Sequence, residues 1–252
     1  MGMAVLVVAC VGIALLCGSL LVRLIERIPE RDPSLRVPVL APLRCDDCSV
    51  DLDAPGHVLL LTTACPECGT GRGLRPRAVQ LTLALAFGAV GAHFGWDWAL
   101  IPFLFLAAVL VAVSFVDFDT MRIPDRLTFP ALAVAVPLLV GVSLIDGHAG
   151  RIGSAALGAV VFFGVLLLFN LIYPAGMGFG DVKLALLLGW YVGWVNTWLV
   201  MYALIIAALL GAVAGIVLLV VTGDRKRGFP FGPFLCVGTM AVVLFGSHLL
   251  PR

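Results

Sequence analysis

The sequence predicts an all-α polytopic membrane protein, with about eight transmembrane helices and one small cytoplasmic loop domain. Hydrophobic residues make up 62% of the 252 residues and charged residues only 12%, whereas about a quarter of the residues in a soluble domain are charged. The mean hydropathy is +1.12. The apolar residues gather in long runs separated by short polar connections, which is the pattern of membrane-spanning helices.

The first apolar run, Met3–Leu24, is long enough to cross a bilayer. It has no basic stretch before it and carries arginines after it, the reverse of a secretory signal peptide, so we expect a retained helix. We divide the chain into a first transmembrane helix (1–25), a polar cytoplasmic loop domain (26–78) and a seven-helix membrane domain (79–252). The apolar runs of that domain predict helices over 79–94, 99–116, 127–145, 152–173, 182–195, 198–221 and 231–250.

The positions of lysine and arginine orient these helices. If the N-terminus lies outside, the inner loops are 25–78, 117–126, 174–183 and 222–230. These loops with their adjoining helix ends hold 14 of the 16 Lys and Arg residues, and only Arg151 and Arg252 fall elsewhere. Basic residues accumulate on the cytoplasmic side of membrane proteins, so we predict that the N-terminus is outside. The net charge of +1 and the lack of a long basic run give no indication of nucleic-acid binding.

The loop domain contains two Cys-x-x-Cys pairs with 16 residues between them. Their members are Cys45, Cys48, Cys65 and Cys68. This spacing is typical of a tetrahedral four-thiolate zinc site. The alternative is a pair of disulfides, which requires an oxidising compartment; a cytosolic loop favours the metal. Three further cysteines lie in apolar segments and are interpreted as small packing residues: Cys10, Cys17 and Cys236.

Two aspartates mark the ends of apolar runs. Asp181 lies in the glycine-rich stretch Gly176–Lys183, which opens into one run, and Asp117 closes another. Because Gly178 and Gly180 have no Cβ, another backbone can approach closely there or the chain can adopt positive φ. An acidic group at the mouth of a membrane helix is costly to ionise and normally marks function or a cap. Both aspartates fall at predicted cytoplasmic helix ends, where they can meet.

Simpler interpretations stay open for several of these side chains. Asp181 can be an N-cap of the helix that follows, and Asp125 fits a helix start still better. Asp119 is either a solvated loop residue or a charge on the substrate side. Lys183 either holds an ionised carboxylate or is an interfacial lysine whose ammonium reaches the membrane surface. For Asp117 no cap interpretation works, because the helix dipole disfavours a carboxylate at a helix C-terminus.

A pair of carboxylates in a poorly solvated site has a defined chemistry. The two groups cannot both ionise easily, so the pair holds one proton. The charged member takes a proton from water while the neutral member donates one to a carbonyl oxygen, which hydrolyses a peptide bond without a covalent intermediate. The histidines lie away from the acid pair and are interpreted as ordinary polar residues: His57, His93, His148 and His248.

Together these residues resemble the Gly-x-Gly-Asp intramembrane aspartyl proteases, specifically the bacterial type IV prepilin peptidases. The resemblance rests on Gly178–Asp181 followed by Lys183, together with Asp117 and Ile123–Asp125. Phe229–Leu235 is similar to the Pro-Phe-Gly-Pro entrance to the last helix of that family. The two Cys-x-x-Cys pairs resemble the zinc-binding loop of its longer members. The resemblance therefore covers nearly the whole chain.

The resemblance implies an activity and a substrate. By it, Asp117 and Asp181 are the catalytic dyad, and the residues that support the motif are Gly178, Gly180, Lys183 and Asp125. The implied substrate is a type IV prepilin or pseudopilin precursor, whose short basic leader is removed at the cytoplasmic face of the bacterial inner membrane. A basic leader stays in the cytosol while the apolar helix behind it lies in the bilayer, so the scissile bond falls at the depth of both aspartates.

The resemblance also implies zinc in the cytoplasmic loop and, in many members, methylation of the new N-terminus with S-adenosylmethionine. At two positions where the family usually has asparagine and glutamate, this chain has Val22 and Gln80. The sequence leaves the oligomeric state open.

Two hypotheses from other classes compete with the peptidase. A proton- or cation-coupled transporter would use intramembrane aspartates, and the short glycine-interrupted segment 176–195 suits it. Against a transporter, both carboxylates lie near one membrane face and the chain has no internal repeat. A non-enzymatic membrane scaffold would use the zinc loop to bind a partner, but it gives the acid pair no role.

Overall fold

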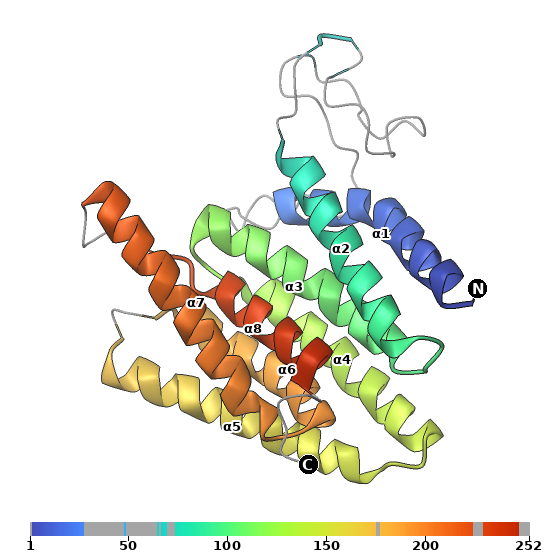
Figure 1. Ribbon diagram of the computed structural model, residues 1–252. Helices are drawn as coiled ribbons and strands as arrows, with labels where there is room; N and C mark the ends of the chain where they lie inside the picture. Colours follow the sequence, from blue (N-terminus) through green and yellow to red (C-terminus); the bar gives the residue numbers. More distant parts are fainter. Residues whose placement is uncertain are drawn as a thin grey trace. The chain divides into compact units, whose positions relative to one another are not determined.

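The computed structural model describes residues 2–27, 48, 65, 67–69, 74–174, 177–223 and 229–246. This described part forms helices and no strand, which confirms the predicted all-α class. In chain order (Figure 1), the helices are α1 (Gly2–Arg27), α2 (Arg75–Phe94), α3 (Leu100–Thr120), α4 (Asp125–Ile145), α5 (Gly150–Ile172), α6 (Phe179–Val195), α7 (Leu199–Thr222) and α8 (Gly232–Phe245). The chain separates into two compact units, Met1–Leu100 and Ile101–Arg252. The division of the chain at residues 25 and 78 stays a prediction.

Six of these helices are long and apolar enough to cross a membrane: α1, α2, α3, α4, α5 and α7. The other two are apolar but shorter, with 17 residues in α6 and 14 in α8. At 1.5 Å per residue α6 is about 25 Å long, less than the roughly 30 Å of a hydrocarbon core. The protein is therefore a multi-pass membrane protein. Residues 247–250 of the predicted last helix lie outside the described residues.

In the first unit, α1 and α2 pack against each other at two glycines. A Cβ on Gly18 of α1 would lie 2.8 Å from Cγ of Gln80, and a Cβ on Gly91 of α2 would lie 2.9 Å from Sγ of Cys10. Neither distance leaves room for a larger residue. Small residues of this kind let membrane helices approach closely without a hydrophobic driving force between them.

The packing interpretation of the lone cysteines is confirmed for two of the three. Cys10 in α1 and Cys236 in α8 are buried. Cys17 is exposed on α1, so the prediction that it packs inside the protein is wrong. The most apolar stretch of α1 is only 28% buried within the chain, and in a bilayer its outer face meets lipid. A free thiol behaves there as a small apolar group.

In the second unit, α6 is the central helix. It contacts α4, α5, α7 and α8, and it is apolar around its whole circumference, as expected for a helix that is buried on all sides. Its fully buried side chains are Val182, Leu184, Ala185, Leu187, Leu188, Tyr191 and Val192. A helix held from four directions is a rigid support for any group it carries.

The contact between α5 and α6 is a backbone contact. A Cβ on Gly158 of α5 would lie 2.5 Å from the carbonyl oxygen of Gly189 and 2.5 Å from Cα of Gly193. A Cβ on Gly193 would lie 2.5 Å from the carbonyl oxygen of Ser154. Real Cβ atoms do not come this close, so these positions hold glycine because the two helices occupy the space of a side chain.

The helices begin and end several residues from their predicted limits at three places that matter for the site. α3 continues to Thr120 rather than ending at 116, α4 begins at Asp125 rather than 127, and α6 begins at Phe179 rather than 182. Apolar patterning sets helix limits only within a few residues, because the polar residues of a first or last turn carry no periodic signal.

Candidate active site

The C-terminal turn of α3 places Asp117 inside the protein, with 4% of its surface exposed. The hydroxyl of Thr120 donates to the carbonyl oxygens of Val116 (2.9 Å) and Arg122 (2.9 Å), and so ties the last turn to the segment beyond it. The chain leaves the helix at Met121, whose φ of 50° is the left-handed conformation that ends many helices. The carboxylate of Asp117 thereby faces the second unit's interior instead of solvent.

The first turn of α6 contacts the segment that follows α3. Gly178 is the N-cap residue, and Asn170 of α5 donates from Nδ2 to the carbonyl oxygen of Met177 just before it (2.9 Å). A Cβ on Gly180 would lie 3.0 Å from Cβ and 3.1 Å from the carbonyl oxygen of Ile123. The expected close backbone approach is therefore confirmed at Gly180. Neither Gly178, with φ of −69°, nor Gly180 adopts positive φ.

Asp181 lies in this first turn of α6 and is 7% exposed. The N-cap interpretation is wrong: Gly178 caps the helix, and no side chain makes a capping hydrogen bond. The atom Oδ1 of Asp181 is buried and has no hydrogen-bond partner among the described residues. A buried polar atom without a partner is costly and unusual, so it requires an explanation other than helix capping.

Asp125 does not cap a helix either. It is the first residue of α4, its N-cap is Pro124, and no side chain caps that end. Both of its carboxylate oxygens lie 2.7 Å from Nζ of Lys183. The same ammonium lies 5.7 Å from the ring centre of Phe129 and 5.3 Å from that of Phe179. Lys183 therefore joins the start of α4 to the start of α6; it does hold an ionised carboxylate, but that of Asp125.

A third segment closes the site at the start of α8. The backbone N–H of Gly232 donates to Oδ2 of Asp117 at 2.9 Å. Phe231, just before it, packs against α7, where a Cβ on Gly211 would lie 3.1 Å from the Phe231 ring. The family resemblance includes the stretch Phe229–Leu235 but gives Gly232 no role of its own. The feature of the sequence that could have drawn attention to Gly232 is a glycine followed by proline at the start of an apolar run.

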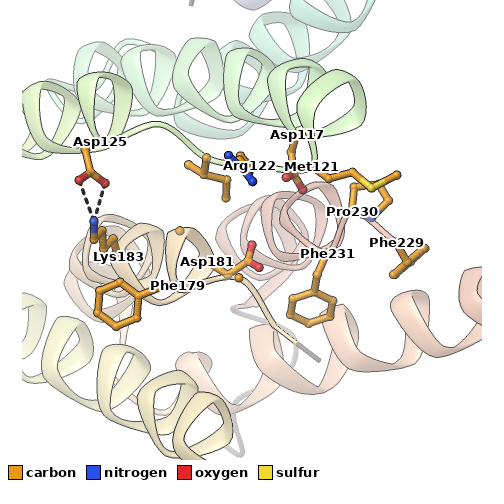
Figure 2. Close-up of a pocket in the computed structure, with 13 residues that line it drawn as sticks. Asp117, Met121, Arg122, Asp125, Phe179, Asp181, Lys183, Phe229, Pro230 and Phe231 are labelled. Atoms are coloured by element: carbon orange, nitrogen blue, oxygen red, sulfur yellow. Dashed lines mark hydrogen bonds and ion pairs between the residues drawn. The ribbon is translucent and has the colours of Figure 1, made fainter. Parts of the chain in front are cut away.

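These segments enclose one pocket of about 390 Å³. Figure 2 shows Asp117 at the end of α3 and Asp181 from α6 on facing walls, with the Asp125–Lys183 pair at the opposite side. The lining residues are Asp117, Met121, Arg122, Ile123, Asp125, Gly178, Phe179, Gly180, Asp181, Lys183, Phe229, Pro230 and Phe231. Asp119 is exposed on α3 and does not line the pocket, nor does His148. Two nearly buried carboxylates that share one pocket have the arrangement that acid–base hydrolysis needs.

In the first unit, three of the four predicted zinc ligands come together. The Sγ atoms of Cys48, Cys65 and Cys68 all lie within 4.8 Å of one another, and those of Cys48 and Cys65 are 3.4 Å apart. Cys45 lies outside the described residues. Three thiolates grouped in this way fit a tetrahedral zinc ion with one further ligand.

Comparison with known proteins decides the family. A profile described as the type IV leader peptidase family matches residues 104–216. A prepilin leader peptidase/N-methyltransferase of Neisseria gonorrhoeae is 31% identical over 203 residues, which make up 77% of this chain and 67% of the relative. The chain belongs to the type IV leader peptidase family. This places it among peptidases, as the sequence motifs predicted, and gives no support to the transporter alternative.

Two further members of the type IV leader peptidase family extend the comparison, both again named prepilin leader peptidase/N-methyltransferase. The protein of Pseudomonas aeruginosa is 31% identical over 199 residues, 76% of this chain and 65% of the relative. The protein of Aeromonas hydrophila is 29% identical over 236 residues, 89% of this chain and 77% of the relative. No solved structure matches the chain significantly. The family profile includes the positions of Asp117 and Asp181 but ends before Gly232.

Proposed function

We propose that this protein is an intramembrane aspartic endopeptidase that removes the short basic leader from type IV prepilin or pseudopilin precursors. The observation that carries the proposal is the placement of two nearly buried carboxylates, Asp117 and Asp181, on one pocket of a member of the type IV leader peptidase family. The relatives named above are prepilin leader peptidases by name. The prepilin substrate is carried over from them.

Asp117 and Asp181 hold one proton between them, because two carboxylates in a poorly solvated pocket do not both ionise. The ionised carboxylate takes a proton from a water molecule, whose oxygen attacks the scissile carbonyl carbon. The protonated carboxyl donates its proton to the carbonyl oxygen. When the tetrahedral intermediate collapses, the protonated carboxyl gives its proton to the leaving nitrogen, the C–N bond breaks, and a hydroxyl of the intermediate returns a proton to the ionised carboxylate, so that the dyad again holds one proton.

The membrane position follows from the charge distribution. With the N-terminus outside the bacterial inner membrane, the end of α3 and the start of α6 both face the cytoplasm. A precursor with a basic leader and an apolar helix presents its scissile bond at that depth. Gly178 and Gly180 shape the first turn of α6, and the pair Asp125–Lys183 joins that turn to α4.

We also propose a structural zinc ion in the loop domain (26–78). Cys48, Cys65 and Cys68 would hold the ion with Cys45 as fourth ligand. Bound there, zinc would cross-link the two Cys-x-x-Cys pairs of the loop domain. The purified protein is then expected to carry one zinc ion per chain by elemental analysis, and Cys48→Ser is expected to lose it.

Methyl transfer from S-adenosylmethionine is a second candidate activity, and it rests on the names of the relatives. The residues of this chain do not match the pair that the family usually carries. Gln80 is 6% exposed and packs against Gly18, and Val22 is 5% exposed, so an amide and an alkyl group occupy those places. We assign no residue to the methyl donor.

The test is cleavage of a purified prepilin by the reconstituted protein, with the products identified by mass. Wild type is expected to remove the leader, and Asp117→Asn and Asp181→Asn are each expected to abolish removal while the protein stays folded. Asp119→Asn is the matched control, because this aspartate is exposed and lies outside the pocket lining. Normal cleavage by both pocket variants would reject the dyad. The same spectra, recorded with S-adenosylmethionine, show whether the new N-terminus gains a methyl group.

A further inference from the structure

The start of α8 offers one backbone donor, and it is directed at the acid pair. Gly232 is the first residue of α8, and Pro233 after it has no N–H. The N–H groups of Phe234 and Leu235 already donate to the carbonyl oxygen of Phe231, at 3.1 and 3.3 Å. The N–H of Gly232 donates instead to Oδ2 of Asp117 at 2.9 Å. A hydrogen bond from a backbone N–H at a helix N-terminus favours the charged form of a carboxylate.

The two carboxylates are therefore in unlike environments. Asp117 lies in the last turn of α3, where that helix's own dipole disfavours a negative charge, so the N-terminus of α8 supplies the compensation. Asp181 lies in the first turn of α6, where the helix dipole favours a negative charge, but among the described residues no group donates a hydrogen bond to its carboxylate, and its Oδ1 is buried. A direct hydrogen bond to a carboxylate contributes more than a helix dipole does. Of the two, Asp117 is the better place for the charge and Asp181 the better place for the proton.

The other charged groups near Asp117 do not reverse this difference. Lys183 is paired with Asp125. Arg122 lines the pocket, but among the described residues it makes no ion pair with Asp117. Cys236 of α8 is a buried thiol, which carries no charge near neutral pH and accordingly favours neither carboxylate. The N–H of Gly232 is the contact in the described site that belongs to one carboxylate only.

Space as well as hydrogen bonding requires glycine at this position. A Cβ on residue 232 would lie 2.7 Å from Oδ2 and 3.2 Å from Cγ of Asp117, and 3.1 Å from Cδ1 of Ile123. Any other residue would displace the carboxylate or the helix start. Either movement lengthens the hydrogen bond between Gly232 and Asp117.

We propose that Gly232 is a positioning residue that keeps Asp117 ionised as the general base, which leaves Asp181 to carry the shared proton as the general acid. This inference rests on the proposed peptidase function. Asp117 then takes the proton from water, and Asp181 gives its proton to the carbonyl oxygen of the scissile bond. The acid and the base are assigned by the start of α8, not by the helices that carry the two aspartates.

The first test is Gly232→Ala, with kcat and KM measured against pH. We expect kcat to fall about 10- to 100-fold with KM nearly unchanged, since a hydrogen bond to a charged group is lost. We also expect the acidic limb of the kcat/KM profile to move to higher pH, because the base is harder to ionise without its donor. Gly238→Ala is the matched control in α8, because it places a Cβ 2.6 Å from the carbonyl oxygen of Ala203 in α7, away from the carboxylates.

The outcomes separate a positioning role from a packing role. A shifted acidic limb in Gly232→Ala but not in Gly238→Ala supports the inference. A wild-type acidic limb in both variants would overturn it, whatever the loss of rate or stability. If wild type itself does not cleave prepilin, the proposed function fails, which is a different result.

A second measurement uses the unsubstituted protein and does not depend on a variant's folding or on cleavage. Phenyl glycidyl ether alkylates an ionised carboxylate: the carboxylate oxygen attacks the epoxide carbon and forms an ester, the epoxide C–O bond breaks, and the epoxide oxygen takes a proton from a neighbouring acid. We expect the ester on Asp117, with Asp181 as the proton donor, and we expect mass spectrometry of the digested protein to locate it there. An ester on Asp181 would reverse the assignment.

Discussion

The two ends of α6 differ in whether their buried polar groups have hydrogen-bond partners. In its last turn, Nε1 of Trp194 donates to the hydroxyl of Ser143 at 2.8 Å, and Ser143 donates to the carbonyl oxygen of Leu139 at 2.8 Å. One turn earlier, the hydroxyl of Tyr191 donates to the carbonyl oxygen of Pro102 at 3.0 Å. In its first turn, by contrast, Asp181 keeps a buried oxygen without a partner among the described residues.

The difference separates stability from chemistry within a single helix. A satisfied buried network stabilises one arrangement, whereas a partly satisfied carboxylate is tolerated only where the surrounding structure holds it in place. Here α5 holds α6 by backbone contact at Gly158, Gly189 and Gly193. We infer that the last turn and the glycine contact fix α6, and that the first turn uses this rigidity to keep a costly group in position.

The largest effect is expected at the first turn. Asp181→Asn should lower kcat about 10²- to 10⁴-fold, the usual contribution of a general acid or base. The double variant with Asp117→Asn should lose no more than either single one, because residues that act as a unit are non-additive. Cleavage kinetics test this, and a double variant whose losses multiply would show that the two aspartates act separately. The thermal midpoint should stay nearly the same, since an amide of the same shape replaces a protonated carboxyl whose buried Oδ1 has no partner to lose among the described residues.

A smaller effect, on stability alone, is expected at the glycine contact. Gly158→Ala places a Cβ 2.5 Å from the Gly189 carbonyl oxygen, and overpacking of this kind costs about 1–3 kcal/mol. Gly164→Ala is the matched control in the same helix, because a Cβ there has no atom within 4 Å. Thermal unfolding in detergent should distinguish the two. Activity per folded molecule should match wild type in both; a loss of kcat in folded Gly158→Ala would mean that α5 also shapes the pocket.

The sequence predicted the helices of the second unit well, and it predicted part of the site at which their ends come together. Long apolar runs and the basic loops placed Asp117 and Asp181 at the same side of the membrane, and both do line one pocket. The sequence could not identify the hydrogen-bond partner of Gly232, because every non-proline residue carries a backbone N–H and the residue type does not show which one reaches a carboxylate. The contact between Gly232 and Asp117 joins residues far apart in the chain, and only the folded structure brings the start of α8 to the last turn of α3.

The capping interpretations failed for a related reason. An aspartate just before an apolar run is a common N-cap, so Asp181 and Asp125 fitted that pattern. In the structure α4 begins two residues and α6 three residues earlier in the chain than the apolar pattern indicates, which moves each aspartate into the first turn. The side chains are then free to face the pocket. Lys183 likewise had two candidate roles, and its partner Asp125 became evident only from the packing of α4 beside α6.

A modest effect is expected at the last turn of α6. Trp194→Phe removes the donor to Ser143 and should cost about 1 kcal/mol, the net contribution of one buried hydrogen bond, together with part of the ring contact to Arg151. Trp198→Phe is the control, since that ring is 74% exposed. Thermal unfolding should separate the two variants. Equal midpoints would show that the indole N–H of Trp194 adds nothing to the stability of this end.

The smallest effect on stability is expected from the ion pair that borders the pocket. The side chains of Lys183 and Asp125 are 24% and 54% exposed, so water screens their attraction and the pair should contribute less than about 1 kcal/mol to folding. A double-mutant cycle with Asp125→Asn and Lys183→Gln measures this coupling from the thermal midpoints. A coupling well above this value would mean that the pair helps to hold the start of α6, and that the pocket end of the helix is not held by its packing alone. With a small coupling, any loss of cleavage in these variants comes from the charge they present to the substrate, because the helix that carries Asp181 stays where α5 holds it.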